Sequence, residues 1–158
     1  MVPFTLNWRR IRRDERGVAL VEFALVLPLL LVLLFGMLDF GKAFNYWINS
    51  THLANEGARW AVVNKNPGSG TLQQYIQEQA DTAELRSGGS ASVADPLQVC
   101  VTFPNGEVVG EPVKVTASVT YHWLPFLGSH IGVLNTTVTG TSIMRLEAVP
   151  TNYSSGCS

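Results

Sequence analysis

The apolar run from Val18 to Leu38 constrains the fold more than any other part of the sequence. It contains 21 residues, fifteen of them Val, Leu or Phe, and its one charged residue is Glu22. As a helix rising about 1.5 Å per residue, it would extend for roughly 31 Å, which is the hydrocarbon thickness of a bilayer. The fifteen apolar residues favour insertion by roughly 5 to 9 kcal/mol, against a cost of about 3 kcal/mol for the acid. We therefore predict a transmembrane helix over residues 18–38.

The distribution of charge predicts the orientation of this helix. Residues 1–17 hold five arginines and two acids, a net charge of +3, whereas the rest of the chain has a net charge of −4. Basic residues stay on the cytoplasmic side, so residues 1–17 form a cytoplasmic leader and everything after Asp39 is extracytoplasmic. Because no basic surface follows the leader, no nucleic-acid partner is expected. The arginines are Arg9, Arg10, Arg12, Arg13 and Arg16.

Other kinds of export segment fit less well. A cleaved secretory signal has a shorter apolar core and a small-residue cleavage site, whereas this run is longer, is interrupted by Glu22 and lacks such an ending. The paired arginines of "WRRIRRD" suggest twin-arginine export, but so strong an apolar core would engage the ordinary insertion route first. An ordinary signal anchor, in which Glu22 snorkels or protonates near the cytoplasmic interface, stays open as an alternative.

Glu22 is expected to have a positively charged partner. An ionisable residue inside a membrane span is a functional hypothesis by default. If the chain were cut between Gly17 and Val18, the new amino group of Val18 would lie one helical turn from Glu22. That amino group could pair with the same carboxylate or with the Glu22 of a neighbouring subunit.

This arrangement resembles a type IV prepilin-type leader. Gly17 is followed by Val18, and Glu22 stands at the fifth position of the would-be mature chain, with basic residues before it and an apolar helix after it. In that family the prepilin peptidase, a membrane aspartyl protease, cuts after the glycine, and the glutamate is thought to set the register between subunits. Val18 replaces the phenylalanine usual in type IV pilins, and Phe23 replaces the tyrosine common in Flp pilins.

Three segments resemble, more narrowly, the TadE-like family of tight adherence (Flp) pilus systems: "VEFALVLPLLLVLLFGMLDFGKAF", "ANEGARWAVV" and "SIMRLE". The resemblance implies a non-catalytic minor pilin or pseudopilin in the bacterial inner membrane, processed at Gly17 and Val18 and assembled through Glu22 and Phe23. The implied partners are the membrane, the prepilin peptidase, other pilin or pseudopilin subunits and the pilus assembly machinery. No cofactor and no small-molecule substrate are implied. The alternative is a permanent single-pass anchor that displays an extracytoplasmic binding or envelope-structural domain.

The helix is expected to continue beyond the membrane, through residues 39–63. A seam of residues recurs there at steps of four and three, which suits packing against a partner helix. The same seam would also suit packing on the chain's own C-terminal domain, and in a pilin both hold at once. Gly41 and Gly57 weaken this helix, and Pro28 should kink or locally open the membrane span. The seam consists of Phe40, Phe44, Trp47, Thr51, Ala54, Ala58 and Ala61.

Residues 64–158 are expected to form an extracytoplasmic α+β domain. Thr71 and Gln74 predict a capping box that opens a second helix, which ends at Gly88 and Gly89. From Leu97 the apolar period becomes two, and Asn105-Gly106 is a hairpin signal. Three or four antiparallel strands follow, with Tyr121 and Trp123 either in the core or in a contact loop. The fold class is therefore α+β, a long transmembrane helix continuing into a helix-backed antiparallel β-sheet domain.

The remaining candidates are cysteines and histidines. Cys100 and Cys157 both lie on the predicted extracytoplasmic side, where a disulfide would stabilise the domain by about 4 kcal/mol. A buried free thiol at Cys100 is the alternative. His52 with Glu56, and His122 with His130, form no recognised ligand motif, so no metal site is predicted. No hydrolase or nucleotide-binding motif occurs, and the sequence predicts no enzyme.

Overall fold

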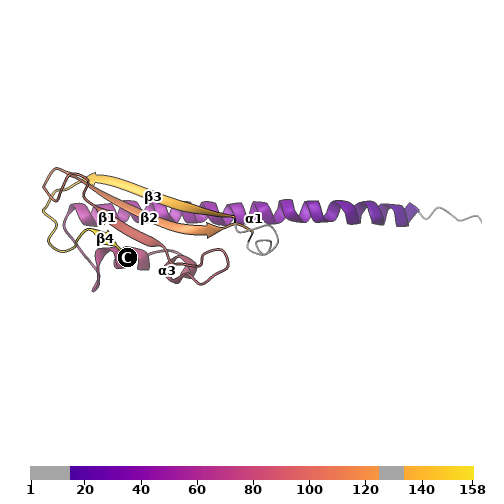
Figure 1. The fold of residues 1–158 in the computed structure, drawn as a ribbon, viewed down its shortest axis with the longest axis horizontal. Helices are drawn as coiled ribbons and strands as arrows, with labels where there is room; N and C mark the ends of the chain where they lie inside the picture. The colour runs from indigo at the N-terminus through magenta and orange to yellow at the C-terminus, as the bar shows by residue number, and fades with distance from the viewer. Residues whose placement is uncertain (1–14, 125–133) are drawn as a thin grey trace, which may run out of the picture. The chain divides into compact units, whose positions relative to one another are not determined.

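The computed structural model describes residues 15–124 and 134–158. Most of the predicted leader and His130 therefore lie outside the described residues. The chain divides into two compact units, residues 1–37 and residues 38–158, and helix α1 (Glu15–Val62) contributes to both. The elements after α1 all belong to the second unit (Figure 1).

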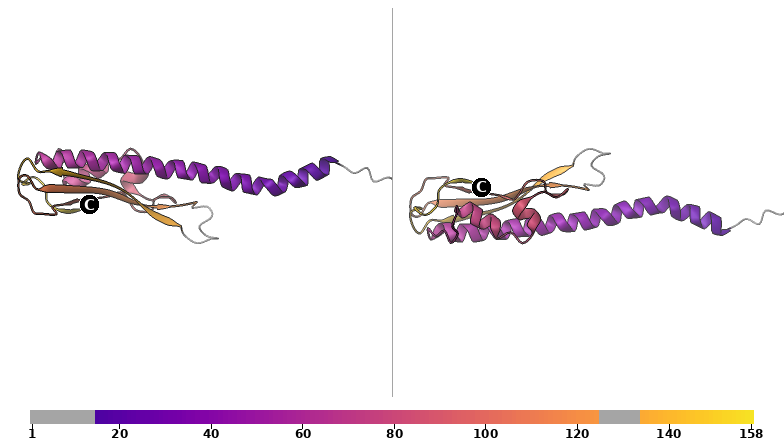
Figure 2. Two further views of the ribbon diagram at one scale, coloured as in Figure 1. Left: turned by 90° about the horizontal axis from the view of Figure 1, so that it is seen from above. Right: turned by 90° about the horizontal axis from the view of Figure 1, so that it is seen from below.

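In the first unit, the side chains of α1 are almost all exposed. Within the described part of the chain, α1 is the helix that is long and apolar enough to cross a membrane. No residue of its most apolar stretch is buried. Pro28 lies inside the helix, where it cannot donate a backbone hydrogen bond to the preceding turn. Figure 2 shows a bend in the indigo part of α1, the part to which Pro28 belongs, in agreement with the predicted kink.

In the second unit, α1 presents one buried face that recurs every three or four residues. Tyr46, Leu53 and the alanines at 54, 58 and 61 are buried. The helix ends because Asn64 adopts a left-handed conformation, with φ of 52°. The Asn64 and Lys65 amides then donate to the carbonyls of Ala61 and Trp60 at 3.0 Å, which is a Schellman motif. The predicted end near Val63 is thus confirmed to within one residue.

Four antiparallel strands form one sheet: β1 (Gln98–Thr102), β2 (Pro112–His122), β3 (Asn135–Arg145) and β4 (Gly156–Cys157). Their order is β3-β2-β1-β4, and β2 pairs with β3 along its whole length (Figure 1). The odd-numbered residues of β2 from 113 to 121 are buried, whereas its even-numbered residues are not, as the alternation predicted. The α+β fold class is confirmed.

Gly140 of β3 sets how closely α1 approaches the sheet. A Cβ atom at this position would lie 2.3 Å from the carbonyl carbon of Ser50 and 2.4 Å from the amide nitrogen of Thr51. Both of these atoms are helix backbone, which cannot turn aside as a side chain can. Only glycine therefore permits this helix-to-strand contact.

One sequence prediction needs correction. The capping box at Thr71 is present, but the single helix predicted after it is two helices, α2 (Leu72–Glu78) and α3 (Ala83–Ser87). Thr82 causes the break, because its hydroxyl accepts from the Leu85 amide and so opens a new helix. The hairpin predicted at Asn105-Gly106 is present, since β1 and β2 pair antiparallel, and residues 103–111 form its connection.

Candidate assembly site

The predicted processing and assembly residues all lie at the start of α1. Gly17, Val18, Glu22 and Phe23 are helical and exposed. Val18 and Glu22 are four residues apart in the helix, so their side chains lie on the same face. The Gly17–Val18 bond lies within the described part of α1. Gly17 has a low helix propensity, which weakens α1 at this bond.

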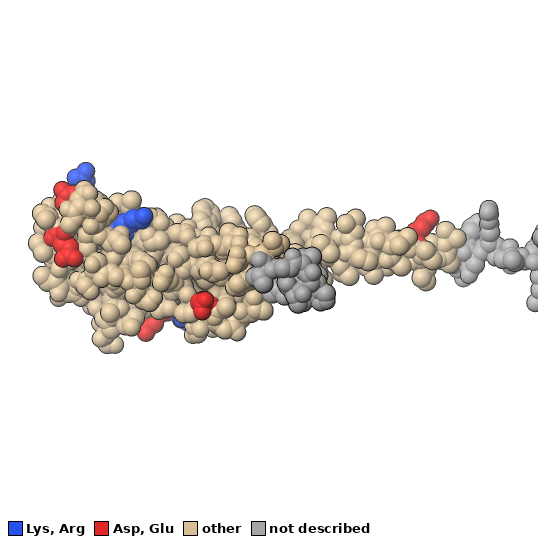
Figure 3. All heavy atoms as spheres, in the orientation of Figure 1, with Lys and Arg blue, Asp and Glu red and all other residues tan. Residues whose placement is uncertain are grey.

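Glu22 is isolated in this part of the helix. Its carboxylate makes no hydrogen bond or ion pair with the residues that the structure describes. Figure 3 shows an acidic patch on this stretch of α1 surrounded by uncharged side chains. A carboxylate in lipid needs a compensating charge, and the described part of this chain does not supply one.

The first charged residues after the apolar run, Asp39 and Lys42, differ from Glu22 because they have hydrogen-bond and ion-pair partners within the second unit. Asp39 accepts hydrogen bonds from the Tyr121 hydroxyl and, at 2.8 Å, from the Leu124 amide. Lys42 pairs with Glu84 of α3 at 2.9 Å. Both charges are thus directed toward the domain.

A buried tyrosine strengthens each of these contacts. The Tyr46 hydroxyl donates to Glu84, and together with Lys42 it lowers the pKa of that carboxyl. Burial, and then the neighbouring Asp39, raises the pKa of Tyr121. Sequence analysis missed this network, although the two charges directly following an apolar run were a usable signal.

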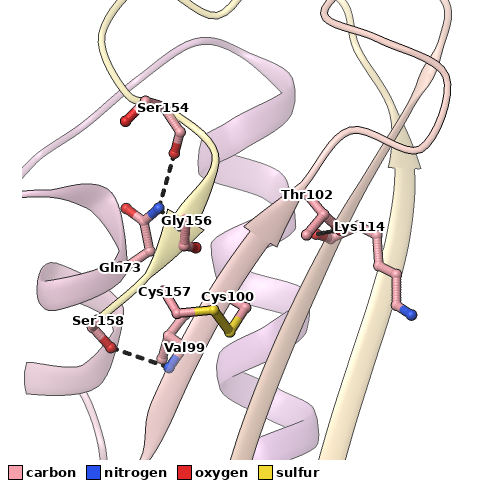
Figure 4. Close-up of a disulfide and its surroundings, with 9 residues drawn as sticks. All are labelled: Gln73, Val99, Cys100, Thr102, Lys114, Ser154, Gly156, Cys157 and Ser158. Carbon is pink, nitrogen blue, oxygen red and sulfur yellow. Dashed lines mark hydrogen bonds between the residues drawn. A yellow bond between two sulfur atoms is a disulfide. The ribbon is translucent and has the colours of Figure 1, made fainter.

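The two cysteines are joined. Cys100 of β1 and Cys157 of β4 are register partners and form a disulfide (Figure 4). Gln73 of α2 donates to the carbonyl of Ser154 at 2.9 Å and so holds the same segment. The bridge closes the short β4 strand onto the sheet, and its role in this structure is to stabilise the domain.

The histidine candidates gather into no site. His52 is exposed and Glu56 half-buried, where both line a groove beside Met144 of β3, and His122 ends β2. Within residues 15–124 and 134–158, no group of three His, Cys, Asp or Glu side chains is placed to hold a metal ion.

Comparison with known proteins bears on α1. The family model described as TadE-like protein matches residues 17–59. This segment of the chain is TadE-like. The TadE-like segment begins at Gly17 and lies wholly within α1, so it includes both the exposed apolar helix and the part that packs on the sheet. It stops before α2 and the four strands. The chain matches no curated protein and no solved structure.

Proposed function

We propose that this protein is a minor pilin or pseudopilin of a tight adherence (Flp) pilus, anchored in the bacterial inner membrane with its N-terminus in the cytoplasm. One observation carries the proposal: the TadE-like segment includes the exposed apolar run of residues 18–38, whose one acid, Glu22, stands four residues after Val18. The protein acts by assembly and not by catalysis. Its partners are the prepilin peptidase, other pilin subunits and the assembly machinery.

The first step is removal of the leader. The prepilin peptidase hydrolyses the Gly17–Val18 bond, which leaves a carboxylate on Gly17 and a free amino group on Val18. A protease needs an extended substrate, so α1 must open locally at the Gly17–Val18 bond, and the low helix propensity of Gly17 favours that opening. The new amino group is protonated near neutral pH and lies within one turn of Glu22.

The second step is assembly through the helix. Subunits exchange lipid contacts for contacts between their apolar helices, which gives close packing but little preference for axial position. A Glu22 carboxylate paired with a Val18 amino group adds that preference, because a shifted subunit would leave both charges unpaired in an apolar surrounding. Phe23, the neighbouring exposed residue, would pack in the same interface.

The size of the exported part supports a minor role. Beyond the apolar run, residues 39–63 extend the helix and residues 64–158 form the extracytoplasmic domain. Major pilins of the resembled systems are very short, so a subunit with such a domain suits an initiating or tip position.

N-terminal mass spectrometry of the protein purified from its native membrane tests the first step. A mature chain that starts at Val18 is expected. An intact leader in cells with an active prepilin peptidase would refute processing. That result would favour the alternative function, a permanent single-pass anchor, which the end of the family match before the strands also suits.

Glu22→Ala tests the second step, with Leu25→Ala as a matched control. Both positions are exposed on the same helix, but only one carries charge. We expect Glu22→Ala to insert into the membrane and to be processed, yet to be missing from sheared pili, whereas Leu25→Ala should be assembled. Equal recovery of both variants in pili would contradict the pairing role of Glu22.

A further inference from the structure

The exposed side of α1 stays apolar beyond the predicted membrane span. Phe40, Phe44 and Trp47 follow Leu38 on the helix and are 62%, 50% and 48% exposed, which is unusual for large aromatic side chains in a folded unit. Ile48 next to them is also half exposed. These residues do not belong to the buried face of α1, which runs through Ala43, Tyr46 and Leu53.

Trp123, just after β2, joins these residues into one surface. Its ring stacks on Phe40 with centroids 6.3 Å apart, while Phe44 and Trp47 contact each other at 5.6 Å. The four rings line a shallow groove of about 390 Å³ between α1 and the beginning of β3. We call Phe40, Phe44, Trp47 and Trp123 the aromatic patch. A contiguous apolar surface of this kind marks a protein or membrane contact.

Charge is absent from the patch because the network described above removes it. The two charged residues of this stretch, Asp39 and Lys42, are bonded to Tyr121 and Glu84 within the domain. At the edge of the patch, the Trp123 indole N–H donates to the Thr136 hydroxyl at 3.0 Å. A surface with aromatic bodies and polar edges is suited to the boundary between lipid and water.

Helix length gives the patch a position relative to the membrane. At about 1.5 Å per residue, Glu22 and Trp47 are separated by roughly 38 Å of helix path. A bilayer with its headgroup regions is about 40–45 Å thick. The helix path from Glu22 to Trp47 is therefore close to the thickness of a bilayer.

We propose that the aromatic patch is the outer membrane-interface anchor of this protein. It lies among the lipid headgroups and acyl-chain ends of the outer leaflet, so that the base of the extracytoplasmic domain is partly immersed in the interface before assembly. The occupant of the groove is lipid. The inference rests on the membrane anchoring in the proposed function but not on leader removal or on the role of Glu22.

Bromine-labelled phospholipids test this proposal, since bromine quenches only nearby tryptophan. The full chain is reconstituted in phosphatidylcholine–phosphatidylglycerol vesicles with acyl chains brominated near the headgroup. Trp47→Phe should remove much of the bromine-dependent quenching, and Trp60→Phe should leave it unchanged. Trp60 is the matched control because it lies on the same helix but packs on Tyr75 of the domain. The near-ultraviolet circular dichroism spectrum checks that each variant folds.

Two added tryptophans separate failure of this proposal from failure of the anchoring. In vesicles brominated deep in the acyl chains, Leu30→Trp should be quenched, whereas Arg59→Trp, near the end of α1, should not. If Leu30→Trp is quenched but Trp47→Phe changes nothing, the membrane-interface proposal is overturned and the anchoring stands. If Leu30→Trp is not quenched, the anchoring fails and both proposals fall.

A second copy of the chain is the competing occupant of the groove. In that case, Trp47 emission would depend on the ratio of protein to lipid and not on bromine. That result would also overturn the proposal.

Discussion

Gly140→Ala is expected to destabilise the domain far more than one added methyl group usually does. The new Cβ would lie 2.3 to 2.4 Å from three backbone atoms of Ser50 and Thr51, so α1 and β3 must move apart. Overpacking of a well-packed interior costs typically 1–3 kcal/mol, and here no flexible side chain can yield. We therefore expect a loss of about 3 kcal/mol, which corresponds to a fall of roughly 10 °C in the melting temperature.

Gly41→Ala is the matched control. It makes the same chemical change on α1, but no atom lies within 4 Å of the new Cβ, and the backbone there is helical. Alanine favours a helix by about 1 kcal/mol over glycine, so this variant should melt at the same or a higher temperature.

Thermal unfolding of the full chain in detergent micelles, followed by near-ultraviolet circular dichroism, measures both variants. This signal reports packing of aromatic side chains in the domain, whereas the far-ultraviolet signal would be dominated by the long helix. If Gly140→Ala and Gly41→Ala melt at the same temperature, the close approach of helix and strand is not a constraint and the reasoning is wrong.

Three further predictions concern the domain. Cys157→Ser, which opens the bridge to Cys100, should lower the free energy of unfolding by about 4 kcal/mol on the loop-entropy model, measured by urea titration of oxidised protein. Tyr121→Phe should cost about 1.5–3 kcal/mol and Tyr153→Phe about 0.5–1.5, because the first hydroxyl donates to a carboxylate and the second to a neutral carbonyl; equal losses in the same titration would contradict this. Folding lowers the pKa of the Glu84 carboxyl below its ordinary value of 4.5. The contribution of Glu84 to the free energy of unfolding is therefore fully present above pH 4.5 and is lost as the pH falls through the lower pKa of the folded state. Glu84→Gln should remove this part of the loss of stability in acid, as measured by a curve of stability against pH.

The sequence predicted best what depends on local periodicity. Three features depend only on neighbouring residues, and each is present in the structure: the long apolar run, the alternation in β2 and the capping box at Thr71. The break at Thr82 was missed because a threonine inside an amphipathic pattern is compatible with both a continuous helix and a new N-cap. Only the surrounding fold decides between the two.

The seam on α1 shows a second limit of pattern reading. Its members follow one spacing, yet Ala54, Ala58 and Ala61 are buried against the sheet whereas Phe40, Phe44 and Trp47 are exposed. Size alone does not separate them, because the large side chains of Tyr46 and Leu53 are buried on the same helix. The polar network around Asp39 was missed for a different reason: the charges after the apolar run could have indicated it, but the partner of Asp39, Tyr121, is 82 residues away along the chain.

The shared use of α1 has a practical consequence for anyone who wants a soluble fragment of this protein. Residues from Ala43 to Val62 supply one wall of the interior, so a fragment that starts after the helix would leave the apolar face of the sheet open to water and prone to aggregate. A fragment that starts at Leu38 keeps that wall and lacks the exposed apolar part of α1. The place to cut lies inside a continuous helix and not at its end.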